Sequence, residues 1–285
     1  MNATVAIHPS ASARRCERAD SGELKIGSYR AHWSPLPLSG YNSQRKLHAV
    51  ALHGMVESPA IWRDQLEQVA FEFCGGYELS MPWHCDDGHL WGLEATPDEW
   101  LQPMFAGLPS GKKVVFAHSF GACALLSLLQ RRPFDDIHAL ILLSPYYKPT
   151  FEEFTWDLFR RCVGEFEAFV ADSIRIRTSA ARISAASLAL LVDKVKDKYG
   201  SYSWVEFYSL YARMPALNLA MLDMPVLILC GDRDLSIIPH DLKALADRLP
   251  NARLELLAQC GHFGMVEQPD AMAAKICSFL ADIEE

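Results

Sequence analysis

A serine in a predicted tight turn between a strand and a helix is the clearest candidate for chemistry. The apolar run Val114–Ala117 leads toward Ser119, and the segment Phe120–Gln130 has a helical pattern. Ala117 and Gly121 stand two positions before and after the serine, where larger side chains would collide with neighbouring backbone. The pattern predicts a nucleophilic hydroxyl exposed at the carboxyl end of a strand. An ordinary helix N-cap serine would have the same local sequence.

A serine hydroxyl becomes a strong nucleophile when a base removes its proton and an acid orients that base. Candidates for both groups stand downstream, each after a predicted strand. Val226–Cys230 leads to Asp232 and Asp234, and Leu254–Leu257 leads to His262. We therefore expect the chain order serine, aspartate, histidine, with two aspartates available as the acid.

The elements that must position these residues alternate along the chain. Short apolar runs end in turns that contain Gly or Ser, and helical patterns follow them. We expect strands at Glu23–Trp33, Leu47–Leu52, Val114–Ala117, Ala139–Leu143, Val226–Cys230 and Leu254–Leu257, and helices at Ile61–Phe73, Pro97–Ala106, Phe120–Gln130, His240–Arg248 and Asp270–Ile283. This alternation predicts an α/β fold with a mainly parallel sheet flanked by helices.

Residues 145–222 interrupt the alternation. They contain only helical patterns, at Phe151–Phe169, Ser184–Lys198 and Ser203–Arg213, and they are rich in aromatic residues. We predict an inserted helical cap at 145–222, a core formed by 23–144 and 223–285, and a loose leader at 1–22. Most of the aromatic residues would pack the cap onto the core, but some should face a substrate cavity.

Several of these motifs resemble those of the α/β-hydrolase family, in particular its cap-bearing serine hydrolases. The resemblance covers about residues 45–283, and it is closest at Gly261–Pro269, where a Gly-His pair precedes a Glu-x-Pro helix start. It implies the α/β-hydrolase fold and a catalytic triad of Ser119, Asp234 and His262. In the family the acid usually stands three residues after the strand-ending glycine, which selects Asp234 over Asp232.

The resemblance also implies an oxyanion hole, a pair of backbone N–H groups that stabilises a tetrahedral intermediate. The family's His-Gly turn matches His53-Gly54, so the donors would be the N–H groups of Met55 and Phe120. His53 would have a structural role. His118, which precedes the nucleophile, would be a packing residue that points away from the site.

The chain departs from the family's pattern after the next strand, at Met81–His89. His84, Cys85, Asp86, Asp87 and His89 cluster there, but their spacing fits no familiar zinc pattern, and we expect neither a metal nor another cofactor. Whether Trp83 or His89 reaches the substrate is left open. The candidate substrate contacts are Trp83, Trp156, Trp204 and Phe263.

Composition limits the partners. The 35 acidic residues exceed the 27 basic ones, for a net charge of -8, and a negative protein repels nucleic acid. No apolar run approaches the roughly 20 residues of a membrane span. The eight cysteines are scattered and no apolar segment follows the N-terminal arginines, so we expect a cytoplasmic protein without a disulfide framework.

Three functions of different class remain. The first is hydrolysis of an ester, thioester or lactone of a small apolar substrate through an acyl-enzyme. The second keeps the triad for C–C bond hydrolysis, lyase or cyclisation chemistry on a metabolite. The third is a non-catalytic protein that binds a ligand in the cap cavity. Dehalogenases and epoxide hydrolases of this fold carry Asp where this chain has Ser119, and are set aside. The sequence indicates no oligomeric state.

Overall fold

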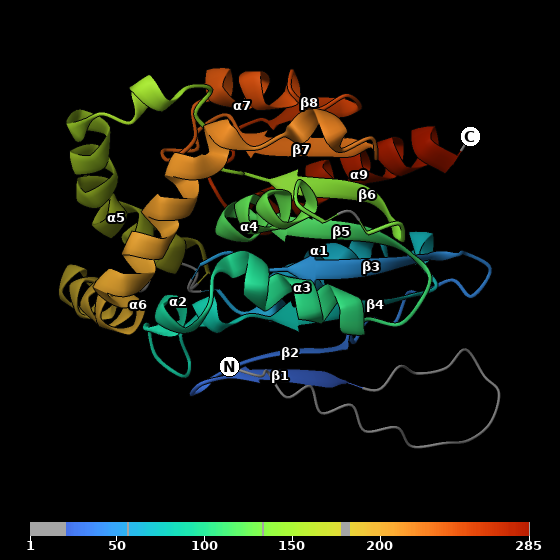
Figure 1. Ribbon diagram of the computed structural model, residues 1–285, viewed down its shortest axis with the longest axis horizontal. Coiled ribbons are helices and arrows are strands. Elements are labelled where there is room, and N and C mark those ends of the chain that lie inside the picture. Colours follow the sequence, from blue (N-terminus) through green and yellow to red (C-terminus); the bar gives the residue numbers. More distant parts are fainter. Residues whose placement is uncertain (1–20, 56, 133, 178–182, 285) are drawn as a thin grey trace.

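The computed structural model describes residues 21–55, 57–132, 134–177 and 183–284. Within these residues one eight-stranded sheet has the order β1-β2-β4-β3-β5-β6-β7-β8 (Figure 1). β2 runs antiparallel to both of its neighbours, and the strands from β4 to β8 pair in parallel. The strands are β1 (Gly22–Ile26), β2 (Tyr29–Pro35), β3 (Leu47–Leu52), β4 (Gly75–Ser80), β5 (Lys112–His118), β6 (Ile137–Leu143), β7 (Val226–Gly231) and β8 (Ala252–Leu257).

The central strands are buried because helices cover both faces of the sheet. One face packs on α1 (Arg63–Gln68) and α9 (Pro269–Glu284) through a core that includes Trp62. The other packs on α3 (Pro97–Gly107), α4 (Ser119–Leu129) and α7 (Pro239–Ala246). Strands that are apolar along their whole length need such cover on both sides. The predicted mainly parallel α/β architecture is confirmed.

The N-terminal part of the sheet differs from the sequence prediction. Glu23–Trp33 was expected to be one strand, but β1 and β2 form a hairpin in which Ile26 pairs with Tyr29. Gly27 makes this turn with a φ of 58°, a conformation that glycine adopts without strain. The predicted leader, residues 1–22, lies outside the described residues except for its end, where β1 begins.

The helical segment inserted between β6 and β7 consists mainly of α5 (Trp156–Arg177) and α6 (Ala185–Arg213). Both helices lie at the end of the molecule that the carboxyl ends of the parallel strands face (Figure 1). Gly200, with φ 62° and ψ 168°, breaks the helical geometry of α6. Two separate helices were predicted there, and this break divides them.

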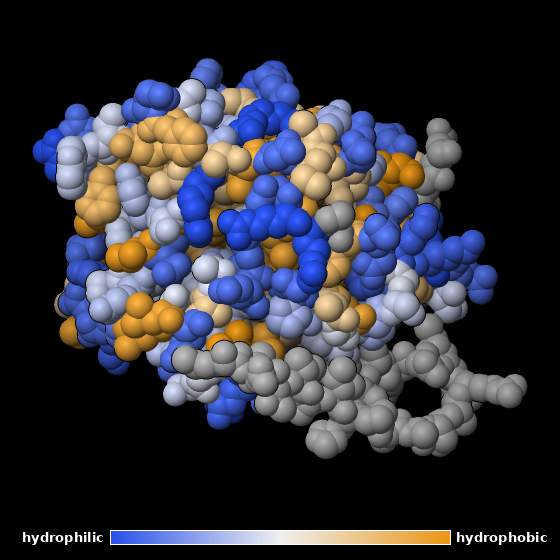
Figure 2. All heavy atoms as spheres, in the orientation of Figure 1, coloured by the Kyte–Doolittle hydropathy of each residue, from blue (hydrophilic) through white to orange (hydrophobic). Residues whose placement is uncertain are grey.

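The surface of the inserted segment mixes apolar and polar side chains. Figure 2 shows orange and blue groups interspersed over the end formed by α5 and α6. The exposed apolar side chains there include Trp156, Leu190 and Val205. Among the described residues, no helix is both long enough and apolar enough to span a membrane.

Candidate active site

Ser119 lies in the turn that joins β5 to α4. Its φ of 52° is in the left-handed region, which is costly for a residue with a side chain and is enriched at active sites. A β-carbon at Gly121 would lie 2.4 Å from the carbonyl oxygen of His53, so the close approach of α4 to the β3 loop requires glycine. The sharp turn leaves Ser119 on the wall of a cavity.

Asp234 and His262 are joined by a buried hydrogen bond. The distance from Nδ1 of His262 to Oδ2 of Asp234 is 2.8 Å, and the two side chains are 4% and 0% exposed. Asp234 follows β7, and His262 follows β8 and precedes the short helix α8 (Gly264–Glu267). Parallel pairing of β7 with β8 therefore places the carboxylate and the imidazole at the same edge of the sheet.

The charges of this pair stabilise each other. Burial favours the neutral form of each group. At Asp234 this effect is outweighed by the positive charge of the imidazole and by the hydrogen bonds that the carboxylate accepts, so the pKa of the carboxyl is lowered. At His262 burial is likewise outweighed, chiefly by the Asp234 carboxylate, and the imidazole's pKa is raised. A base with a carboxylate behind it is suited to hold a proton taken from a nucleophile.

The other ring nitrogen of His262, Nε2, is buried and has no hydrogen-bond partner among the described residues. Aromatic rings surround the imidazole: Phe169 of α5 has its ring centre 5.0 Å away, and Tyr146 lies at 5.9 Å. These rings pack against the imidazole. Nε2 thus remains available as a proton acceptor.

His118 makes more specific contacts than a packing residue would. Its Nε2 donates to the carbonyl oxygen of His262 at 3.0 Å, and its Nδ1 lies 2.8 Å from a carboxylate oxygen of the buried Glu57. Glu57 also accepts a hydrogen bond from the Gly54 N–H at 2.7 Å. The side chain of His118 therefore connects the loop after β3 to the backbone at His262, instead of pointing away from the site as was predicted.

His53 is held in its neutral form. Its Nδ1 donates to the carbonyl oxygen of Gly54 at 2.7 Å, and its Nε2 accepts from the Met81 N–H at 3.0 Å. Only one nitrogen carries a proton in this arrangement, and burial lowers the imidazole's pKa to about 4. The ring anchors the loop that carries Met55.

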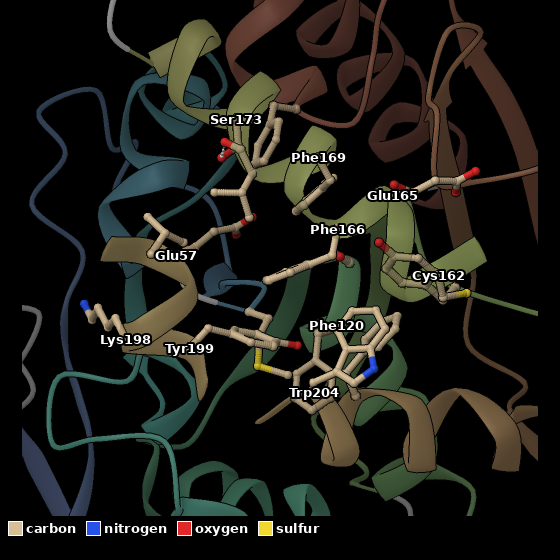
Figure 3. Close-up of a pocket in the computed structure, with 18 residues that line it drawn as sticks. Glu57, Phe120, Cys162, Glu165, Phe166, Phe169, Ser173, Lys198, Tyr199 and Trp204 are labelled. Carbon is tan, nitrogen blue, oxygen red and sulfur yellow. Dashed lines mark hydrogen bonds between the residues drawn. The ribbon is translucent and has the colours of Figure 1, made fainter. Parts of the chain in front are cut away.

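A cavity of about 240 Å³ opens beside Ser119. Its walls come from the core and from the inserted segment. Eight of the 18 lining residues are aromatic: Phe120, Tyr146, Phe166, Phe169, Tyr199, Trp204, Phe207 and Phe263. Figure 3 shows Phe166 and Phe169 on one side of the cavity, with Tyr199 and Trp204 facing them. Met55, Phe120 and Ser119 also line this cavity.

The predicted substrate contacts divide into two groups. Trp204 and Phe263 line the cavity. Trp83 is fully buried in the core, where its Nε1 donates to the carbonyl oxygen of His53 at 3.2 Å. Trp156 is 80% exposed, and neither Trp83 nor Trp156 is among the described residues of the cavity wall.

Two further groups in the site had no clear signal in the sequence. Ser144, at the end of β6, donates to Oδ2 of Asp234 at 2.9 Å. Glu57 lines the cavity although it is almost fully buried. A polar residue directly after an apolar strand, as at Ser144, was the only available hint.

The loop His84–His89 connects the core to α6. Nε2 of His84 lies 2.9 Å from Asp86, and Asp86 forms an ion pair with Lys198 at 2.8 Å. No group of three or more potential metal ligands comes together within the described residues. The ion pair between Asp86 and Lys198 holds this loop against α6, whose Lys198 lines the cavity.

Comparison with solved structures shows the same fold in several proteins. The chain is 16% identical to a membrane phospholipase A described as a bacterial virulence factor, with a TM-score of 0.68 over 93% of this chain and 87% of that one. It is 17% identical to a putative lipase from Acinetobacter baumannii AYE (TM-score 0.66, 93% and 92% covered). It is 18% identical to a thermophilic esterase from Thermogutta terrifontis (TM-score 0.62, 94% and 100% covered). At such low identity these likenesses concern the fold alone.

The sequence itself gives the family. No curated protein matches the chain significantly. The model of the alpha/beta hydrolase family, however, matches residues 49–275, a span that includes the turn at Ser119, both aspartates and His262. The chain therefore belongs to the α/β-hydrolase family and is a hydrolase of that fold.

Proposed function

We propose that this protein is a serine hydrolase that cleaves an ester, thioester or lactone of a small, apolar substrate. The observation that carries the proposal is the buried 2.8 Å hydrogen bond between Asp234 and His262, at the sheet edge where Ser119 lines the cavity. Burial of an ionisable pair is costly unless the two groups compensate each other. A catalytic role explains why such a pair is found at the same sheet edge as a serine with a left-handed backbone.

In the proposed mechanism, Ser119 Oγ attacks the substrate's carbonyl carbon while Nε2 of His262 accepts its proton. The tetrahedral oxyanion is stabilised by the N–H groups of Met55 and Phe120. Phe120 is in the first turn of α4, where N–H groups lack helical acceptors and the helix dipole favours negative charge. The imidazolium then protonates the leaving group, and water releases the acyl group by the same steps in reverse order.

The substrate's class follows from the cavity in this proposal. A wall with many aromatic side chains favours an apolar body, and a volume of about 240 Å³ limits its size. We take residues 145–222 as a cap, because Phe166, Tyr199 and Trp204 from this segment form much of that wall. Trp204 and Phe263 are the proposed substrate contacts. The predicted cytoplasmic location is part of the same proposal.

A panel of nitrophenyl esters and acyl thioesters of increasing acyl length tests this function. The wild type should turn over short and medium apolar members. Ser119→Ala and His262→Ala should each lower kcat by roughly 10⁴-fold or more. Circular dichroism should show the native fold in both variants, and Ser119→Ala should keep a melting temperature close to that of the wild type. Turnover that survives Ser119→Ala would contradict the mechanism. A wild type that hydrolyses no member would favour the lyase, cyclase or binding alternatives.

A further inference from the structure

Ser144 occupies a conformation that serine rarely adopts. It is the first residue after β6, it is fully buried, and its φ is 49°. Its own N–H donates to the carbonyl oxygen of Leu229 in β7 at 2.8 Å, so the backbone is fixed between two central strands. Glycine would adopt this conformation without strain. The presence of serine therefore suggests a requirement for its hydroxyl.

The hydroxyl contacts the candidate triad directly. Oγ of Ser144 donates to Oδ2 of Asp234 at 2.9 Å, and the same oxygen accepts from Nδ1 of His262 at 2.8 Å. The other oxygen, Oδ1, accepts from the Ser236 N–H at 2.9 Å. A carboxylate without solvent exposure needs several donors to remain ionised. The Ser144 side chain, at the end of β6, donates to the carboxylate oxygen that contacts His262. The Ser236 N–H donates to the other oxygen.

We propose that Ser144 is a positioning residue that fixes Oδ2 of Asp234 toward His262 and limits the basicity of that oxygen. The inference rests on the proposed triad. It explains why a strained serine is found at the end of β6, beside β7, which carries the acid.

The expected change in pH dependence follows from the hydrogen bond. The Ser144 hydroxyl helps to lower the pKa of Asp234. Without that donor the carboxylate is more basic and stabilises the imidazolium of His262 more strongly, so the acid limb of kcat/KM should move to higher pH. Other titratable groups face the pair and stay unchanged in the variants: Glu57, His118, Tyr146, Cys230, Cys260 and Glu267.

Two substitutions separate the role of the hydroxyl from that of the backbone. Ser144→Ala removes the hydroxyl and keeps a side chain in the left-handed conformation, while Ser144→Gly removes both. We expect both variants to lower kcat by roughly 10- to 150-fold, the effect of one hydrogen bond to a charged group, with KM nearly unchanged and the acid limb shifted upward. A suitable control is Gln259→Gly, at an exposed residue with a φ of 54°, which should leave kcat and the pH profile unchanged.

If Ser144→Gly keeps the kcat and the pH dependence of the wild type, the proposal is overturned, because the hydroxyl would then be dispensable. A loss of kcat without any shift of the acid limb in either variant would overturn it as well. The low-field proton resonance of Nδ1–H in His262 provides a readout that needs no substrate, and it should move downfield in both variants. If this resonance moves but no ester is hydrolysed by the wild type, the proposed function fails and the positioning role stands.

Discussion

Among single residues, the two aspartates after β7 illustrate how location decides chemistry. Asp234 is enclosed and contacts His262, whereas Asp232 is exposed and accepts a hydrogen bond from the Cys260 N–H at 3.2 Å. The two residues are close in sequence, but only one can orient the imidazole. Asp232 helps to hold the loop that leads to His262.

We expect Asp234→Asn to lower kcat by roughly 10⁴-fold, since an amide favours the wrong imidazole tautomer. Asp232→Asn is the matched control, with the same chemical change two residues away, and should alter kcat by less than about 3-fold. Steady-state kinetics on the most active nitrophenyl ester measures both. A more severe loss in the Asp232 variant would show that the wrong acid has been chosen.

The pH profile provides a second test at this scale. The pKa of His262 is raised above its usual value of 6.5, and only the neutral imidazole can accept a proton. As pH falls through this raised pKa the base becomes protonated, so kcat/KM should decrease below a midpoint that lies above pH 6.5. Initial rates between pH 5 and 9 measure the midpoint, and a flat profile would rule out His262 as the base.

At the scale of elements, Gly200 divides α6 into two halves, and residues of both halves line the cavity. Lys198 and Tyr199 line it before Gly200, and Trp204 and Phe207 line it afterwards. The backbone at Gly200, with φ 62° and ψ 168°, is essentially restricted to glycine. A β-carbon there would also lie 2.3 Å from the ring of His89. The break in α6 thus determines the shape of the cavity wall.

Gly200→Ala should therefore lower the free energy of unfolding by about 2–3 kcal/mol and reduce kcat/KM, because α6 would have to straighten or move. Gly164→Ala is the control on α5: it is exposed, and a β-carbon there meets nothing within 4 Å. That substitution should instead increase stability by about 0.5–1 kcal/mol. Urea unfolding compares the two, and equal effects would contradict the role assigned to Gly200.

How well an element could be predicted from the sequence depended on how that element is buried. The strand Leu47–Leu52 could be predicted because a strand covered on both faces must be mostly apolar, and five of its six residues are. The hairpin at Gly27 was missed because its half-exposed strands alternate through the turn without an obvious interruption. The cavity wall could not be derived, since the inward side of α5 and α6 depends on how the two helices pack. For this reason Trp204 could not be distinguished from Trp156, which lies in solvent.

At the scale of the whole molecule, one buried histidine should contribute to the pH dependence of stability. His53 stays neutral in the folded protein, with a pKa of about 4, but titrates near 6.5 when unfolded. The unfolded state therefore binds more protons between these values, and stability is lost as the pH falls from about 6.5 to 4. The folded and unfolded pKa values of His53 differ by roughly 2.5, which corresponds to about 3 kcal/mol of stability.

The measurement is the free energy of unfolding in urea at pH 7 and pH 4 for the wild type and for His53→Gln. Glutamine keeps one of the hydrogen bonds but does not titrate. The wild type should lose about 3 kcal/mol more than the variant on acidification. Identical losses in the two proteins would indicate that His53 is not held neutral in the folded state.

The strand ends of the sheet collect residues that are far apart in the chain, and this is what makes an active site possible here. Three segments supply the candidate nucleophile, acid and base, and a fourth supplies the oxyanion loop. The order of these residues could be predicted from the sequence, while their support by Ser144, Glu57 and His118 depends on contacts between strands that only the folded chain defines.

Labelling with a fluorophosphonate probe tests the central claim most directly. Such probes form a covalent bond only with an activated serine. We predict that the wild type is labelled once, at Ser119 as located by peptide mass spectrometry, that Ser119→Ala is unlabelled, and that labelling is lost after heat denaturation. Absence of labelling in the folded wild type, or labelling of another serine, would contradict the account.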